Sequence, residues 1–187
     1  MSAPTTTTLA AGTWTGDPVH SDVSFKARHM AVGKVRGTFD LVSAALTVGA
    51  DGIPGAQVTA VIDAASVETK SEQRNDHIKS ADFLDVEKFP TIEFASTEVR
   101  DFDGESFTVV GDLTAHGVTN QVELAAEFLG QTTDAYGAER SGFSATTSIS
   151  RAAFGVDIQM GFGAGNAVVG DKIEIAIELE LTLAAGE

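Results

Sequence analysis

The segment RNDHIKSADFLDVEKFP gathers the side-chain types of an acid/base site. Arg74, Asp76 and His77 stand within four consecutive positions of a stretch with a helical pattern. A general base needs a partner within hydrogen-bond reach. On one helix, however, Asp76 and His77 point about 100° apart, whereas Arg74 and His77 share a side. No Gly-x-Ser-x-Gly elbow is present. An enzyme with His77 or His29 as its base therefore remains the alternative rather than the leading prediction.

Patterns for metal and phosphate binding are weak. The four histidines, His20, His29, His77 and His116, form no pair one helical turn apart or alternating on one strand, and the chain has no cysteine. The loop Gly161–Asp171 is rich in glycine, but it lacks a Lys-Ser/Thr ending and precedes an alternating pattern instead of a helix. We predict no metal and no cofactor, and we interpret the loop as a connection between strands.

The overall charge restricts the partners. The 27 acidic and 12 basic side chains give a formal net charge of -15, which repels nucleic acid and anionic membrane surfaces. Four cations, Lys26, Arg28, Lys34 and Arg36, nevertheless fall close together and form a local patch that could meet one anionic group. The simpler interpretation of this patch is a solvated rim. We predict no nucleic-acid partner.

The N-terminal sequence MSAPTTTTLAAG has neither a basic nor a long apolar region, and no later run reaches the roughly 18 apolar residues of a membrane span. We therefore expect a cytoplasmic protein without stable membrane insertion. Residues 1–12 are predicted to form a disordered tail, and residues 13–187 a single domain whose 43% apolar residues are enough for a core.

Period-2 alternation dominates this domain and predicts an all-β fold. It is clearest at the C-terminus, where apolar Ile173, Ile175, Ile177, Leu179 and Leu181 alternate with Glu174, Glu178 and Glu180. Similar runs begin at Val23, Val58, Ile92, Phe107, Val122 and Phe143, and a longer one extends from about Val35 to Val48. These eight strands, joined by turns rich in Gly, Asp and Asn, favour a closed antiparallel barrel, which has no exposed edge and can hold one small ligand.

One short helix interrupts the strands. Thr69 followed by Glu72 is a capping-box pattern and predicts a helix over about 69–81. Ile78, Phe83 and Leu84 give it a small apolar side, so we expect it to lie over a barrel end.

The apolar residues suggest a cavity. Eleven phenylalanines but one tryptophan and one tyrosine make an aromatic surface with few polar groups. Small residues accompany them on the predicted inner faces: Ala27, Gly37, Ala60, Gly111, Ala126 and Ala145. Gaps beside the phenylalanines would form an elongated apolar cavity. Its alternative is a filled barrel that binds no ligand and serves a structural or interaction role.

Five ordered blocks resemble the YceI-like family. They are DPVHSDVSFKARHM with VRGTF, RNDHIKSADFLDVEKFPTIEF, GDLTAHGVTNQVEL, SISRAAFGV and VGDKIEIAIELEL, and the resemblance extends from about Thr13 to Leu183. It implies a lipocalin-like barrel that binds a polyisoprenoid or related long apolar chain, with the helical block beside the opening. Many relatives are exported, whereas this sequence shows no signal peptide. The exposed strand surface and the resemblance are compatible with a homodimer, which we keep as an expectation.

The leading prediction is a non-enzymatic carrier, storage or stress-related protein that binds a polyisoprenoid, an isoprenoid quinone or a fatty-acid-like lipid. Arg74 and His77 are expected to pin a lid or to meet a polar head group. The predicted ligand-binding residues are Phe25, His29, Met30, Phe39, Ile62, Arg74, His77, Ile78, Phe83, Phe94, Phe143, Phe154, Met160 and Phe162.

Overall fold

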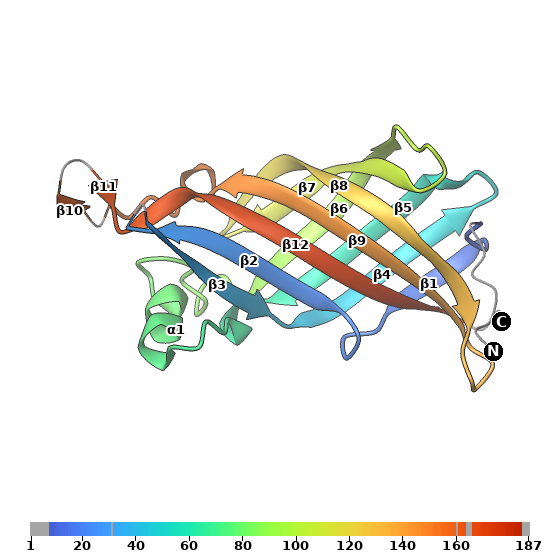
Figure 1. Ribbon diagram of the computed structural model, residues 1–187, viewed down its shortest axis with the longest axis horizontal. Helices are drawn as coiled ribbons and strands as arrows, with labels where there is room; N and C mark the ends of the chain where they lie inside the picture. Colours follow the sequence, from blue (N-terminus) through green and yellow to red (C-terminus); the bar gives the residue numbers. More distant parts are fainter. Residues whose placement is uncertain (1–7, 31, 160, 164–165, 185–187) are drawn as a thin grey trace.

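A single antiparallel β-barrel makes up most of the structure, a computed structural model that describes residues 8–30, 32–159, 161–163 and 166–184. The barrel is longer than it is wide, with one helix at one end and the beginning of the first strand and the end of the last strand at the other (Figure 1). The helical elements are η1 (Ala64–Ser66), α1 (Glu72–Lys79) and η2 (Ala152–Phe154). The all-β fold class predicted from the alternation is confirmed.

Ten strand segments form the main sheet, and together they make eight staves. The segments are β1 (Gly12–Gly16), β2 (Asp22–His29), β3 (Gly33–Phe39), β4 (Leu41–Gly49), β5 (Gly52–Asp63), β6 (Thr91–Arg100), β7 (Ser106–Ala115), β8 (Val118–Thr133), β9 (Glu139–Ser150) and β12 (Val169–Leu183). Strands β1 and β2 pair with successive parts of β12 and form one stave, and β3 and β4 form another that bends at Asp40. A small hairpin of β10 (Gly161–Gly163) and β11 (Asn166–Ala167) lies outside the sheet.

Pairing between the first and the last strands closes the barrel. Trp14 of β1 stands opposite Leu183 of β12 on one side and Leu46 of β4 on the other. The remaining neighbours follow in chain order from β4 to β9, as expected for hairpin connections. One of them, between β7 and β8, is a two-residue turn at His116 and Gly117, whose positive φ angles of 52° and 73° are those of a type I′ hairpin.

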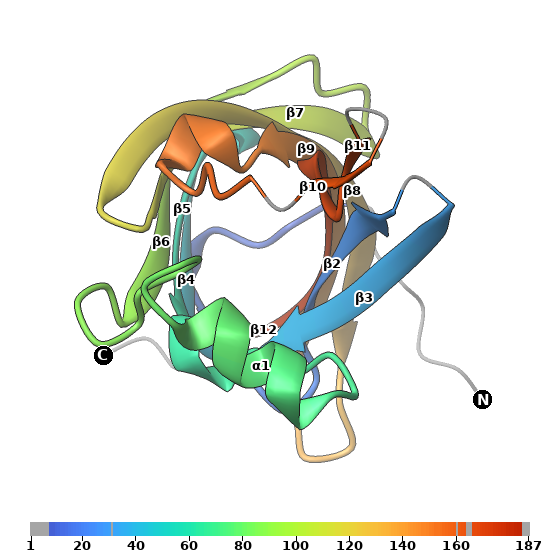
Figure 2. The same ribbon diagram turned by 90° about the vertical axis from the view of Figure 1, so that its left-hand side faces the viewer.

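The barrel wall is incomplete at the helix end, which we call the mouth. There β3 has no neighbouring strand beyond β2 among the described residues except for a bridge between Thr38 and Glu68, and the segment 64–90 with α1 covers this side (Figure 2). Strands β8 and β9 also separate toward the mouth. The last pair of their ladder on this side is Ala125 and Thr146. Helix η2 packs at this second opening, where Asn120 Nδ2 donates to the Ala153 carbonyl at 2.8 Å.

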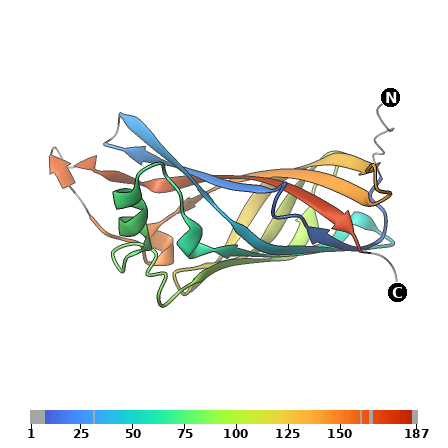
Figure 3. The same ribbon diagram turned by 90° about the horizontal axis from the view of Figure 1, so that it is seen from below.

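The opposite end, which we call the packed end, contains the main hydrophobic core. Its buried members are Leu9, Trp14, Leu46, Val48, Ile53, Ala56, Phe107, Val109, Leu124, Ala126, Phe128 and Leu181. Trp14 and Leu181 are completely inaccessible to solvent. Seen from below, β1 and the end of β12 lie at this end, away from α1 (Figure 3). Inward side chains of β1, β4, β5, β7, β8 and β12 therefore fill one end of the barrel.

Helix α1 is shorter than predicted, and its first turn is built differently. It begins at Glu72, and its N-cap residue Ser71 makes no side-chain cap hydrogen bond. Thr69 is buried, and its hydroxyl donates to Asn75 Oδ1 at 2.6 Å instead of capping a free backbone N–H. The capping box is therefore wrong. The hydrogen bond from Thr69 to Asn75, which lies one turn into the helix, instead fixes the chain that precedes α1.

The N-terminal residues that the structure describes pack against the barrel. Leu9 is part of the packed-end core, and the Ala10 N–H donates to Gln131 Oε1 at 2.9 Å. Residues 8–12 thus differ from the tail predicted over 1–12, of which 1–7 lie outside the described residues. Within the described part of the chain, no helix is long and apolar enough to cross a membrane.

Candidate ligand-binding cavity

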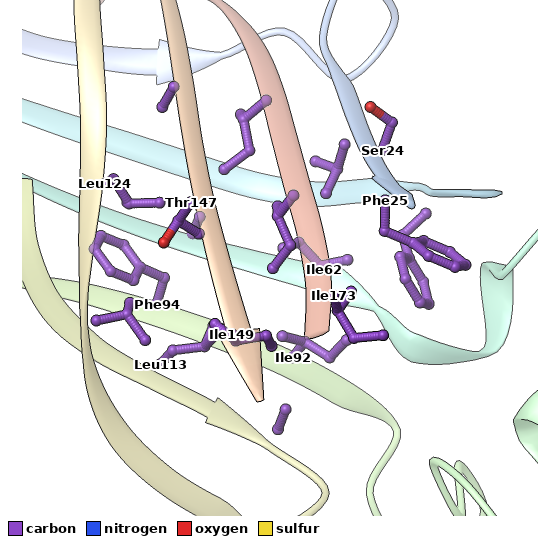
Figure 4. Close-up of a pocket in the computed structure, with 18 of the residues that line it drawn as sticks. Ser24, Phe25, Ile62, Ile92, Phe94, Leu113, Leu124, Thr147, Ile149 and Ile173 are labelled. Carbon is purple, nitrogen blue, oxygen red and sulfur yellow. The ribbon is translucent and has the colours of Figure 1, made fainter. Parts of the chain in front are cut away.

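A cavity of about 680 Å³ runs inside the barrel from the mouth to the packed end. Its floor is made by Leu46, Ile53 and Leu181 of the packed-end core. Figure 4 shows the middle of the cavity, where side chains from strands around the barrel converge on a common space. Volumes of this size are typical of binding sites for small molecules.

Two glycines keep this space open by letting aromatic rings lie against the wall. Gly37 stands opposite Phe25, and a Cβ atom on it would lie 2.5 Å from the ring. Gly111 has the same relation to Phe94, with a contact of 2.5 Å. Because a methyl group at either position would push the ring away from the wall, glycine there increases the width of the cavity.

The side chains around the cavity are apolar and only partly buried. Phe94, Ile149 and Ile173 point inward, yet each is intermediate in exposure. In a filled core such positions are almost inaccessible, as Trp14 and Leu181 are at the packed end. The inner wall of the mouth half therefore presents apolar surface that no protein atom covers.

Polar groups concentrate around the mouth. Gln73, Arg74 and His77 of α1 line the cavity together with His29 at the end of β2. Carbon side chains dominate further inside, where Thr147 is an exception whose hydroxyl donates to the Glu123 carbonyl at 2.7 Å. The arrangement fits a molecule with a polar head near α1 and an apolar chain that extends toward the packed end.

Arg74 holds the start of α1 in place. Its Nε donates to Thr69 Oγ1 at 2.9 Å, and its Nη2 donates to the Thr69 carbonyl at 2.7 Å. Asn75 extends the network, because its Nδ2 donates to Glu68 Oε2 at 2.9 Å. Glu68 in turn pairs through its backbone with Thr38 of β3. The network therefore joins α1 to the edge of the barrel wall.

His77 has a carboxylate partner, but the pair is open to solvent. Its Nε2 lies 3.1 Å from Asp82 Oδ2, and the two side chains are 40% and 62% exposed. The ring also packs edge-on against Phe83, with centroids 4.9 Å apart. Both contacts tie the helix to the turn that follows it. His77 is one of the two bases, with His29, that the enzyme alternative names, and Asp82 would be its carboxylate partner.

Arg151 is the most deeply buried cation among the described residues, with 7% of its surface exposed. Its guanidinium donates to four backbone carbonyls, those of Val156 (2.6 Å), Ile158 (3.1 Å), Val169 (3.2 Å) and Gly170 (3.2 Å). Nearby Asp171 has a lowered pKa because the Ser150 hydroxyl and the Ala152 N–H hydrogen-bond its carboxylate and Arg151 attracts it. These bonds fix the chain between β9 and β12 where it passes the mouth.

A second polar cluster lies away from the cavity mouth. Arg140 Nη1 contacts Asp17 Oδ2 at 2.9 Å and Glu180 Oε1 at 2.6 Å, and its Nε contacts Asp134 at 2.8 Å. Hydrogen bonds from His20 and then Arg140 lower the pKa of Asp17 to about 2. Asp17, His20 and Glu180 also have the ligand types and spacing of a metal site. Arg140 already contacts the carboxylates of both Asp17 and Glu180 and supplies a positive charge between them.

Comparison with known proteins assigns the fold and the sequence to one family. Residues 14–181 match the YceI-like domain. The chain belongs to the YceI-like family. A UPF0312 protein of Vibrio vulnificus is 36% identical over 139 residues, which are 74% of each chain. A UPF0312 protein of an Enterobacter species is also 36% identical over 142 residues, covering 76% of this chain and 73% of the relative.

Three solved structures share the architecture of this YceI-like barrel. BcnA of Burkholderia cenocepacia superimposes with a TM-score of 0.74 at 23% identity, covering 88% of this chain and 98% of that one. The YCEI protein of Campylobacter jejuni has a TM-score of 0.71 at 27% identity, with coverage of 84% and 90%. A polyisoprenoid binding domain from Saccharophagus degradans has a TM-score of 0.67 at 14% identity, with coverage of 91% and 98%.

The structure brings most of the predicted ligand-binding residues to the YceI-like cavity. Those that line it are Phe25, His29, Phe39, Ile62, Arg74, His77, Ile78, Phe83, Phe94, Phe143 and Phe154. Met30 does not line it, because its side chain is exposed on the turn after β2. Met160 lies outside the described residues, and Phe162 belongs to β10 at the rim. Contact of these residues with a ligand stays a prediction.

Aliphatic residues make up much of the lining that the prediction omitted. Leu113, Leu124, Ile149 and Ile173 all point into the cavity (Figure 4). The alternation pattern had placed these positions on inner faces, but the site prediction gave priority to phenylalanine. Arg151 was also omitted, and no local pattern in the sequence indicates that its guanidinium turns toward backbone carbonyls.

Proposed function

We propose that the protein binds one long apolar molecule inside the barrel and serves as its carrier or store. The observation that supports this most directly is the cavity of about 680 Å³, whose apolar wall is left uncovered by protein atoms in the mouth half. The polar residues at the mouth, Arg74 and His77 among them, favour an amphiphile whose head stays near α1.

The volume decides how long the chain of such a molecule can be. A methylene group needs about as much room as a liquid water molecule, roughly 30 Å³. The cavity of about 680 Å³ therefore accommodates on the order of twenty carbons when it is well filled. A cavity too small for a chain of about ten carbons would favour the alternative of a barrel that binds no ligand. The observed volume is about twice that size.

The energy of burial is sufficient for useful affinity. Each buried methylene contributes about 0.8 kcal/mol, so ten contribute roughly 8 kcal/mol, which corresponds to a dissociation constant near micromolar before ordering costs. Polyisoprenoids, isoprenoid quinones and fatty-acid-like lipids all have chains of about ten carbons or more. The family supports the first class, because one structural neighbour is a polyisoprenoid binding domain.

Solvent extraction tests the proposal directly. The protein is purified without detergent and extracted with organic solvent, and the extract is analysed by mass spectrometry. We expect a long-chain apolar compound in a ratio near one per barrel. Titration with a polyisoprenoid alcohol, an isoprenoid quinone and a fatty acid then ranks the ligand classes. A clean extract together with no measurable binding of all three would overturn the proposal.

The enzyme alternative makes a different prediction for His77. If its pair with Asp82 were a catalytic base, the substitution His77→Ala would abolish turnover of a bound ligand and spare its affinity. Under the carrier proposal, the bound compound is recovered chemically unchanged from both proteins. The cytoplasmic location and the homodimer stay predictions, and gel filtration of the loaded protein checks the second.

A further inference from the structure

The outer face of the β2–β3 hairpin carries a grid of four cations. Lys26 and Arg28 on β2 and Lys34 and Arg36 on β3 are all exposed. In register, Lys26 stands opposite Arg36, and Arg28 stands opposite Lys34. Directly opposed like charges destabilise a strand pair. Two such pairs in succession therefore favour a function that requires the positive charge.

Protection of a sheet edge explains only half of this grid. Lysine and arginine on an edge strand prevent pairing with other chains, and β3 is largely such an edge among the described residues. Strand β2, however, lies between β12 and β3 and has no free edge, so Lys26 and Arg28 are not accounted for. Glu174 of β12 offsets one charge, because it stands opposite Lys26 and lies 3.9 Å from Lys34 Nζ.

The tip of the same hairpin is apolar and exposed. Met30 is 38% exposed, and Val32 is 94% exposed. Arg28 and Lys34 flank them on the two strands. Exposed apolar side chains bordered by cations are typical of segments that rest in the interface of a membrane, with the apolar groups at the acyl boundary and the cations at the phosphates.

Positive charge is concentrated on the hairpin, so the net value of -15 does not describe it: residues 22–39 carry four cations and one acid, whereas the segment 64–90 carries four cations and six acids. All lysines and arginines except Arg100 and Arg140 belong to the hairpin, the segment 64–90 or the chain around η2 and the start of β12, whereas Arg100 ends β6 and Arg140 begins β9 at the other end. Charges are screened beyond about 8 Å at physiological salt. A surface that meets the hairpin therefore experiences its local positive charge.

Six acids at this end of the barrel belong to the segment 64–90. Glu72 and Asp76 belong to α1, which borders a different part of the mouth from the β2–β3 turn (Figure 2). The hairpin tip, the β10–β11 hairpin and the mouth nevertheless face the same end of the molecule (Figure 1). Contact through the tip would therefore bring the cavity opening close to whatever the tip touches.

We propose that the β2–β3 hairpin docks the mouth of the barrel on an anionic phospholipid bilayer. The apolar tip of Met30 and Val32 enters the boundary between head groups and acyl chains, and the four cations contact phosphates. Apart from Arg28, which also borders the cavity, this surface lies outside the cavity, and it does not depend on which ligand the barrel holds. Docking there gives an apolar molecule a path from the bilayer to the mouth without crossing water.

Vesicle sedimentation of the full chain tests the charges. We expect binding to vesicles of equal parts phosphatidylcholine and phosphatidylglycerol, and little binding to phosphatidylcholine alone. Each cation near such a surface strengthens binding about fivefold, so the double variant Arg28→Gln, Lys34→Gln should bind roughly thirtyfold more weakly. The matched control is Thr47→Glu, Gln57→Glu, another exposed cross-strand pair with the same change in net charge. Equal weakening by both variants would mean that only net charge matters, and would overturn the proposal.

A second pair of variants tests the apolar tip. Val32→Asp should reduce vesicle binding at least tenfold, whereas Val19→Asp should leave it unchanged. Val19 is also a valine, 85% exposed, but lies in the loop before β2, away from the mouth. Circular dichroism confirms that both variants fold. Absence of wild-type binding to the mixed vesicles, or equal loss in both variants, refutes docking by this hairpin.

The cavity proposal fails or holds independently. The vesicles contain no free isoprenoid, quinone or fatty acid, so sedimentation does not require uptake of any of the ligands that the titrations use. Val32→Asp protein should still bind the long-chain ligand when the ligand is added from ethanol without vesicles. Loss of ligand binding with intact docking would instead affect the carrier proposal and leave the docking surface in place.

Discussion

The mouth and the packed end of the barrel are built from the same strands but differ in what their inner faces contact. On β12, Leu181 is completely buried at the packed end, whereas Ile175 and Ile173, on the same face of the same strand, are only partly buried beside the cavity. Alternation of apolar residues is therefore the same in a filled and in a hollow half. Residue size and the covering segments decide which half is empty.

Polar anchoring differs between the two ends as well. Arg151 near the mouth is buried and donates to backbone carbonyls, while Arg140 is 28% exposed and contacts carboxylates. The mouth needs this fixed backbone because, in the part of the chain that the structure describes, its wall lacks continuous strand pairing between β8 and β9 and beyond β3. A hollow half thus depends on specific hydrogen bonds where the filled half depends on packing.

Truncation of one side chain at each end should give the largest difference. Leu181→Ala should lower the free energy of unfolding by about 3 to 5 kcal/mol, because it leaves a cavity in a filled core. Ile175→Ala on the same strand should lower it by about 1 kcal/mol, because that side chain already faces open space. Urea unfolding followed by circular dichroism measures both. Equal losses would show that the mouth half is packed like the core.

Replacement of the two arginines should separate the kinds of anchoring. Arg151→Ala leaves several carbonyls without a donor and should cost about 3 kcal/mol of unfolding free energy. Arg140→Ala removes partly exposed ion pairs and should cost about 1 kcal/mol. The same urea titrations serve for the comparison, and a larger loss for Arg140→Ala would contradict it.

Filling the cavity should weaken ligand binding without unfolding the protein. Ala60→Leu adds bulk to the inner face of β5 and should lower the affinity for a chain that fills the cavity about tenfold, since it displaces about two methylene groups. Ala95→Leu adds the same bulk to an exposed position on the neighbouring strand and serves as the control. Titration with ligands of decreasing length measures the effect, which should disappear for short chains.

The smallest effect should come from acid at the second polar cluster. The pKa of Asp17 is lowered to about 2 in the folded protein, below its ordinary value of 3.8. Its contribution to stability is therefore complete above pH 4 and is lost as the pH falls toward 2. Asp17→Asn should flatten this part of the stability curve and leave the ligand affinity at pH 7 unchanged. An identical acid profile for the variant would exclude Asp17 as the titrating group.

The sequence was most informative where a pattern repeats. Eight staves, the turn at His116 and Gly117 and the inner faces of the strands all follow from period-2 alternation and turn residues. The approximate position of α1 was also predicted, from the capping-box pattern at Thr69 and Glu72, although its first residue was not. Thr69 has a capping sequence, yet Arg74 and Asn75 take its hydrogen bonds, and such tertiary competition is invisible in a local pattern.

The cavity was predicted less completely than the strands, because its shape depends on positions that carry no side chain to fill the interior. Phe25 and Phe94 could be assigned to inner faces, but the effect of Gly37 and Gly111 on their rings depends on strand register, which the sequence does not state. Arg151 belongs to the block SISRAAFGV that carries the family resemblance, but its role was not predicted, since its partners are backbone carbonyls. The same limit applies to Met30, whose position after β2 left open whether it turns inward or outward.

Closure of the barrel by its first and last strands has a consequence for biosynthesis. Trp14 of β1 reaches its partner Leu183 only after β12 has left the ribosome, which at ordinary rates of synthesis is on the order of ten seconds or more after β1 itself emerges. Until then the inner faces of the intervening strands lack their final neighbour. The apolar strand faces of the nascent chain therefore stay exposed to aggregation during synthesis, and the completion of β12 ends this exposure.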